Sequence, residues 1–92
     1  MNKQEHLLVI LMEECAELQK ECAKALRFGM DDHEPGSKET NGQRIIHEFD
    51  DVVAVGEMLF GDNLFNCTLV NDKKVKIAKW MVYSKEKGTL TE

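Results

Sequence analysis

The stretch LVILMEECAELQKECAKA, from Leu8 to Ala25, decides the expected fold because its apolar residues recur at alternating steps of three and four. This spacing places them along one seam of an α-helix that packs against a partner helix. We predict a helix from about Gln4 to Phe28, ended by Gly29. Its two cysteines are expected to be buried, because free cysteine behaves as a small hydrophobic residue. The seam comprises Leu8, Leu11, Cys15, Leu18, Cys22 and Ala25.

A second seam of the same kind predicts a helix from about Gln43 to Phe60, with Asn41 as its N-cap. The segment from Gly29 to Gly42 contains Pro35-Gly36, four acids and no apolar periodicity, so it is predicted to be a loop. The second seam comprises Ile45, Phe49, Val52, Gly56 and Leu59.

A third helix is predicted from about Asp72 to Lys87, with Val75, Ala78 and either Met81 or Val82 facing inward. Residues 63–71 fit either a short helix or an irregular connection. No strand-like alternation competes with these assignments. We therefore expect one all-α domain over residues 1–92, an antiparallel bundle of three long helices with or without a short fourth one.

The chain has 92 residues, of which 42% are hydrophobic and 32% charged, a composition typical of a helical globular protein. A domain this small buries a modest share of its surface, so we expect it to complete its core as a homodimer or homotetramer. The longest apolar run is too short to span a membrane, and the N-terminus does not resemble a signal peptide. The expected location is therefore the cytoplasm.

The net charge of −5 argues against binding to a nucleic-acid polymer. The charge is unevenly distributed. Residues 1–62 carry 14 acids and 6 bases, a balance of −8, whereas residues 63–92 carry 3 acids and 6 lysines, a balance of +3. The first part is therefore suited to hold cations, and the second part could meet an anion.

Two pairs of carboxylates lie one helical turn apart on the first two helices. Glu14 and Glu17 point the same way on the first helix, as do Glu48 and Asp51 on the second. Both pairs border the apolar seams, so each can reach the groove between the helices. The adjacent Glu13 and Asp50 face more outward.

Carboxylates at this spacing repel one another, and a divalent cation removes that cost. The four oxygen ligands suit a hard ion, Mg²⁺ or alternatively Mn²⁺, that keeps open positions for substrate phosphates. One carboxylate could also orient or deprotonate an attacking water. The alternative is an ordinary acidic surface, because a single Glu-x-x-Glu is common on helices. A di-iron site is disfavoured, since no histidine has Glu three positions before it.

Basic residues are the candidates for substrate binding. Lys76 and Lys79 lie on one side of the third helix and could bind phosphates, or they could form a solvated lysine face. Arg27, at the end of the first helix beside the loop, could bind a phosphate or interact favourably with the helix C-terminus.

The two acidic motifs, Glu13-Glu14-x-x-Glu17 and Glu48-x-x-Asp51, resemble the signature of the MazG-like, all-α nucleoside triphosphate pyrophosphohydrolases. The similarity extends to the Ala25–Gly29 segment ALRFG and to the lysine-rich end, as in small phage-type members, and so covers nearly the whole chain. The longer loop between the motifs departs from compact members of that family.

The resemblance implies hydrolysis of a (deoxy)nucleoside triphosphate to the monophosphate and pyrophosphate. It places Mg²⁺ at Glu14, Glu17, Glu48 and Asp51, with Glu14 and Glu17 as the expected catalytic residues. It also implies dimers, or dimers of dimers, with bundles completed between subunits. The alternatives are a phosphoribosyl-ATP pyrophosphohydrolase, a related activity, and a non-catalytic helical interaction module whose acids are merely exposed.

Overall fold

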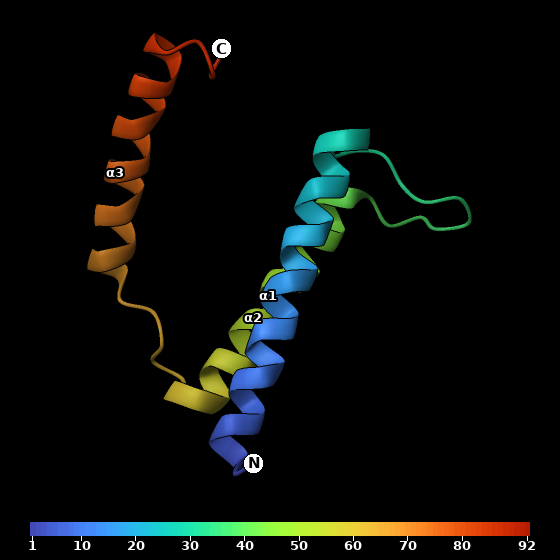
Figure 1. Cartoon of the computed structure of the whole chain (residues 1–92), viewed down its shortest axis with the longest axis vertical. Coiled ribbons are helices and arrows are strands. Elements are labelled where there is room, and N and C mark those ends of the chain that lie inside the picture. Colours follow the sequence, from blue (N-terminus) through green and yellow to red (C-terminus); the bar gives the residue numbers. More distant parts are fainter.

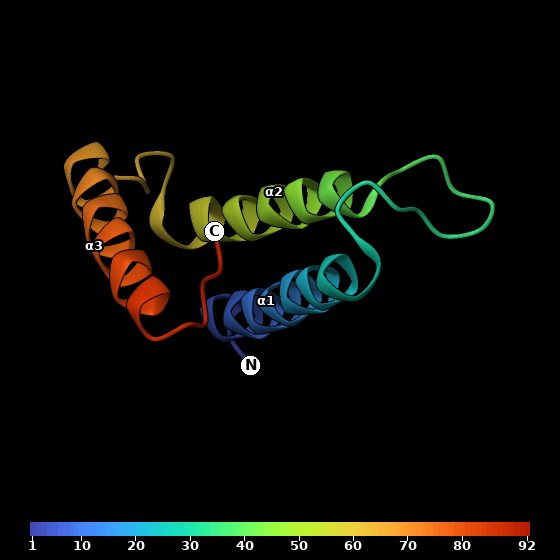
Figure 2. The same ribbon diagram turned by 90° about the horizontal axis from the view of Figure 1, so that it is seen from above.

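A computed structural model describes all 92 residues, and it contains three α-helices and no strand (Figure 1). The helices are α1 (Lys3–Phe28), α2 (Asn41–Phe60) and α3 (Cys67–Glu86). α1 and α2 lie side by side and run antiparallel, whereas α3 contacts neither of them (Figure 2). The all-helical prediction is confirmed, but a single chain forms a two-helix hairpin with a detached third helix. None of the helices combines the length and the apolar character needed to cross a membrane.

The ends of α1 follow from local capping. The side chain of Asn2 accepts a hydrogen bond from the Glu5 N–H at 2.8 Å, and the Glu5 side chain accepts one from the Asn2 N–H, which forms a capping box. At the other end, Gly29 adopts φ 102°, a conformation that favours glycine, and its N–H donates to the Ala25 carbonyl. The predicted stop at Gly29 is confirmed.

The predicted N-cap of α2 is wrong by one residue. Thr40 is the cap, since its hydroxyl accepts from the Gln43 N–H at 3.1 Å while its own N–H donates to the Gln43 side chain. Asn41 is instead buried, and its side chain donates to the Gly29 carbonyl at 2.9 Å. The Asn41 N–H also donates to the Asp32 carbonyl. Asn41 therefore closes the base of the loop between α1 and α2.

The third helix begins five residues earlier than predicted. Asn66 caps it by accepting a hydrogen bond from the Leu69 N–H at 3.1 Å. Residues 67–71, which the sequence left open, are thus the first turns of α3 and not a separate helix. Residues 61–66 form the connection from α2.

The packed face of α1 is rotated relative to the predicted seam. Leu11, Leu18 and Ala25 face α2 as expected, but Leu8, Cys15 and Cys22 are exposed, so the predicted packing of these three residues is wrong. The other residues of α1 that are not exposed are Leu7, Ile10, Glu14, Glu21 and Lys24.

The packed face of α2 is rotated in the same sense. Phe49, predicted to pack in the seam, is 53% exposed. Glu48 occupies the packed position instead. Both helices carry wide apolar stripes with acids along one edge, so the periodicity permits two seams that share several residues. The structure uses the seam that includes the acids. The face of α2 toward α1 comprises Asn41, Ile45, Glu48, Val52, Val55 and Leu59.

No residue of α3 is buried, so the predicted inward direction of Val75, of Ala78 and of either Met81 or Val82 is wrong for the single chain. Val75 is 70% exposed. The radius of gyration is 16.4 Å, whereas a compact domain of this length has about 12 Å. The apolar side chains of α3 therefore lack a partner within their own chain.

We expect Asn41→Ala to lower the free energy of unfolding by about 1–2 kcal/mol, because it deletes the buried hydrogen bond that holds the Gly29 carbonyl. Asn63→Ala is the matched control, since Asn63 is exposed and makes no side-chain hydrogen bond. Urea unfolding followed by circular dichroism measures both. Equal stability of the two variants would contradict a role for Asn41 in closing the loop.

Candidate metal centre

The rotated helix faces bring the predicted carboxylates together in the middle of the α1–α2 hairpin. Oxygen atoms of Glu14, Glu48 and Asp51 all lie within 4.8 Å of one another. A second group, Glu17, Glu21 and Glu48, meets the same criterion. Glu48 belongs to both groups, so the four predicted acids form one continuous cluster with a fifth acid, Glu21.

The members of this cluster differ in exposure. Glu14 and Glu48 are half-buried on the packed faces, whereas Glu17 and Asp51 are exposed at the rim. Glu13 and Asp50 are exposed and belong to neither group, as their outward direction predicted. The cluster is therefore open to solvent on one side and backed by the helix interface on the other.

Glu48 bears the main electrostatic cost of the arrangement. Partial burial raises the pKa of its carboxyl above the usual value, and the negative charges of Asp51, Glu14, Glu17 and Glu21 raise it further. Its Oε2 atom is buried and has no hydrogen-bond partner. A buried oxygen without a donor, among other carboxylates, fits the ligand set of a hard divalent cation.

Sequence reasoning missed Glu21, although it lies seven residues after Glu14 and four after Glu17, and so shares their face. Glu21 is only 4% exposed. Its Oε1 lies 3.5 Å from the Lys24 Nζ, and its Oε2 lies 3.7 Å from the Arg44 Nε without forming a hydrogen bond. The buried charge of Glu21 is thus balanced by one cation from each helix.

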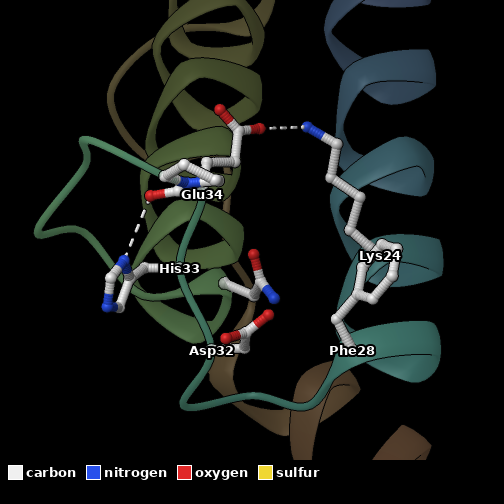
Figure 3. A pocket seen from close by; sticks show the side chains of 7 residues that line it. Lys24, Phe28, Asp32, His33 and Glu34 are labelled. Atoms are coloured by element: carbon white, nitrogen blue, oxygen red, sulfur yellow. Dashed lines mark hydrogen bonds and ion pairs between the residues drawn. The ribbon is translucent and has the colours of Figure 1, made fainter.

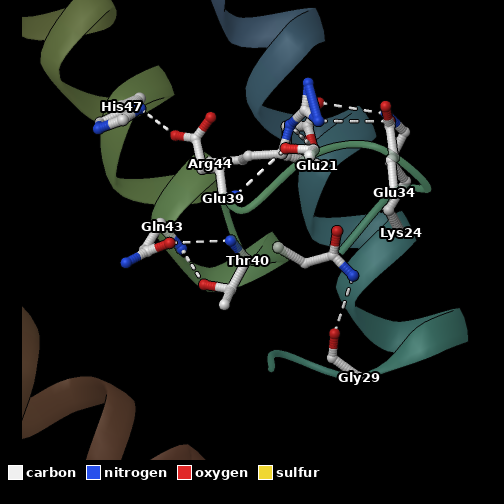
Figure 4. Close-up of polar contacts among 11 residues, drawn as sticks. Glu21, Lys24, Gly29, Glu34, Glu39, Thr40, Gln43, Arg44 and His47 are labelled. Atoms are coloured by element: carbon white, nitrogen blue, oxygen red, sulfur yellow. Dashed lines mark hydrogen bonds and ion pairs between the residues drawn. The ribbon is translucent and has the colours of Figure 1, made fainter. Parts of the chain in front are cut away.

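The same two cations hold the loop. The Lys24 Nζ donates to the Glu34 Oε1 at 2.9 Å, and the Arg44 Nη1 lies 3.4 Å from that oxygen (Figure 4). The hydrogen bond with Glu34, partly opposed by desolvation, raises the pKa of Lys24. The same bond and the charge of Arg44 lower the pKa of the Glu34 carboxyl.

A cavity of about 200 Å³ lies beside this ion-paired group, between the end of α1 and the loop (Figure 3). The Lys24 and Glu34 side chains form part of its wall, and the Phe28 ring closes one side. The rest of the lining comprises Asp32, His33, Pro35 and Asn41.

The predicted substrate-binding residues lie elsewhere in the single chain. Arg27 is exposed, and its guanidinium sits 4.8 Å from the centre of the Phe28 ring. Lys76 and Lys79 are on α3, where they line a surface hollow with Trp80, and α3 contacts neither helix of the cluster. Within one chain, these three cations do not join the carboxylates.

No family model, curated protein or solved structure matches the chain.

We expect Glu48→Gln to raise the melting temperature in chelator-treated buffer at neutral pH. The raised pKa means that the folded state favours the uncharged form, so the charge costs stability as pH rises through the folded pKa. Glu13→Gln, at an exposed position outside the cluster, is the matched control and should change little.

Adding MgCl₂ should then stabilise the unmodified protein more than Glu48→Gln, because ligand binding to the folded state raises its stability. Differential scanning fluorimetry measures both effects. A lower melting temperature for Glu48→Gln without metal would contradict the proposed repulsion.

Proposed function

We propose that this protein is a Mg²⁺-dependent enzyme that hydrolyses a (deoxy)nucleoside triphosphate to the monophosphate and pyrophosphate. The observation that carries the proposal is the convergence of Glu14, Glu48 and Asp51 within 4.8 Å across two helices, with Glu17 joined through Glu48. The resemblance of both acidic motifs to the MazG-like signature supports the same activity.

The residues present suit the metal. All candidate ligands are carboxylate oxygens, and the unpartnered Oε2 of Glu48 lies among them. Oxygen-only ligand sets favour Mg²⁺, with Mn²⁺ as the alternative. Glu14, Glu17, Glu48 and Asp51 would hold the ion, which supplies neutralisation of phosphate charge and activation of a water nucleophile.

Glu14 and Glu17 are the proposed catalytic residues. Glu17 lies at the exposed rim, where solvent has access, whereas Glu14 is half-buried at the helix interface. A rim carboxylate can take the proton of a water that attacks a phosphorus atom. The bond to the leaving phosphate oxygen breaks in that reaction, and pyrophosphate departs. Glu48 and Asp51 would hold the ion from the opposite helix.

We also propose that the protein self-associates as a homodimer or homotetramer. The chain exposes 7633 Å² at a mass of 10.5 kDa, whereas a compact monomer of that mass exposes about 5,400 Å². If each of two copies buried the difference between these two areas in a shared interface, that interface would bury about 4,400 Å² in total. This value is within the range of obligate homodimers.

Several apolar groups are available for such an interface. Trp80 is 65% exposed on α3, and an apolar pocket of about 250 Å³ lies where the second half of α2 meets Leu11 of α1 and the connection to α3. Assembly is also the route by which Lys76 and Lys79 could reach a carboxylate cluster, on a second copy of the chain. Such an assembly would bring the acidic part of one chain next to the lysine-rich part of another.

We expect a screen of nucleoside triphosphates to show Mg²⁺-dependent release of pyrophosphate that Glu17→Gln and Asp51→Asn each reduce by about a hundredfold or more. The matched controls are Glu13→Gln and Asp50→Asn. They make the same changes at neighbouring exposed positions outside the cluster and should retain activity. Circular dichroism checks that all four variants keep their helices.

Unchanged turnover in both cluster variants would overturn the proposal. Release of pyrophosphate from phosphoribosyl-ATP alone would favour the related histidine-synthesis activity. An absence of hydrolysis with every nucleotide, with or without Mg²⁺, would favour the non-catalytic interaction module.

We expect light scattering after size exclusion to give the mass of two or four chains. Trp80→Glu should shift that mass towards one chain, since a charge buried in an apolar interface is costly, while it remains solvated in the single chain. Thr68→Glu is the control, because it adds the same charge at an exposed position of the same helix that is already polar. A monomer at micromolar concentration would contradict self-association.

A further inference from the structure

The structure contains a second charged group next to the carboxylate cluster, and its cations are shared between two acids. Every ion pair of a lysine or arginine in the chain involves Lys24 or Arg44, and their partners are always Glu21 and Glu34. Lys24 is on α1 and Arg44 on α2, so the two cations face each other across the hairpin (Figure 4).

The two acids of this group are not equivalent. The Glu21 side chain is 6% exposed and belongs to the packed face of α1, so it is fixed in place. The Glu34 side chain is 50% exposed and comes from the loop, so it can leave without unfolding a helix. Glu21 balances one of the two positive charges, and Glu34 balances the other.

The position of the group matters because Glu21 also belongs to the carboxylate cluster. Its oxygen lies within 4.8 Å of ligand atoms of both Glu17 and Glu48. Its buried Oε2 has no hydrogen-bond partner. An anion held by Lys24 and Arg44 would therefore lie directly beside the candidate metal centre.

We propose that Lys24 and Arg44 form an anion-binding slot that takes phosphate groups of the substrate, and that the Glu34 carboxylate occupies this slot in the free protein. The proposal rests on the nucleotide substrate proposed above and deepens it. Arginine and lysine bind carboxylate and phosphate through the same charge-assisted hydrogen bonds, so one anion can replace the other. Release of Glu34 would also widen the cavity whose wall it forms with Lys24 (Figure 3).

The internal carboxylate lowers the apparent affinity for the substrate, because only the fraction of molecules with an empty slot can bind. The affinity gained on removing Glu34 is small, since a half-exposed ion pair is weak. The arrangement keeps the two cations, whose side chains are 23% and 27% exposed, paired until a more highly charged anion arrives. Glu34 would also make the slot selective for highly charged anions, since a singly charged anion competes poorly with its carboxylate.

The test is isothermal titration calorimetry with inorganic tripolyphosphate in the presence of MgCl₂. Glu34→Gln should bind about fivefold more tightly than the unmodified protein, as expected for loss of a weak internal competitor. Glu39→Gln is the matched control, because it removes the same charge from the same loop without touching either cation, and it should leave the affinity unchanged.

Lys24→Gln should weaken binding about tenfold or more, because it removes one of the two charge-assisted partners. Lys38→Gln, at an exposed loop position with no ion pair, is its control and should bind normally. Lys24→Gln leaves the contact between Glu21 and Arg44 in place, so we expect this variant to stay folded.

Equal affinities for Glu34→Gln and Glu39→Gln, or unchanged binding in Lys24→Gln, would overturn the slot. If either result were found together with metal-dependent hydrolysis, the anion-binding slot would be refuted while the proposed function would be supported. Conversely, tighter tripolyphosphate binding in Glu34→Gln without any nucleotide hydrolysis would support the slot and refute the proposed function.

Discussion

The packing of α1 against α2 places carboxylates within a largely apolar interface, and the features of the candidate site follow from this. Glu14 and Glu48 occupy packed positions between leucine and valine neighbours. Burying charge without a partner is unfavourable. The Oε2 of Glu48 is buried without a hydrogen-bond partner, and desolvation together with the neighbouring acids raises the pKa of this carboxyl. An interface that served stability alone would place apolar residues at these positions. Cys15 and Phe49 lie next to Glu14 and Glu48 in the sequence and could have filled them, but both are exposed.

The charges along the hairpin are arranged in order. Acids without basic partners, Glu14, Glu48 and Asp51, gather in its middle, whereas Glu21 is neutralised by Lys24 and Arg44 nearer the loop. The middle therefore suits a cation, and the loop end suits an anion. A metal complex of a polyphosphate carries both kinds of charge, so this order fits the proposed substrate better than either group would alone.

The detached third helix gives the isolated chain an incomplete core. α3 contacts neither α1 nor α2, and its apolar side chains face solvent. The cysteines and Phe49 on the unused seam of the hairpin are exposed as well. Surfaces of this kind normally mark contacts between proteins. Self-association would cover them and would add the lysines of α3 to the acidic hairpin of another copy.

The sequence by itself determined the first two helices, the end of α1 at Gly29 and the acids that share a face, because these depend on local capping and on the 3.6-residue period. It could not choose between two seams that share Leu11, Leu18 and Ala25, since both satisfy the same periodicity. Only the tertiary structure turned Glu14 and Glu48 inward and Cys15 outward. It also decided that Glu21 joins the cluster and that Glu34 reaches Lys24 and Arg44, because contacts between a loop and two helices depend on how those helices pack.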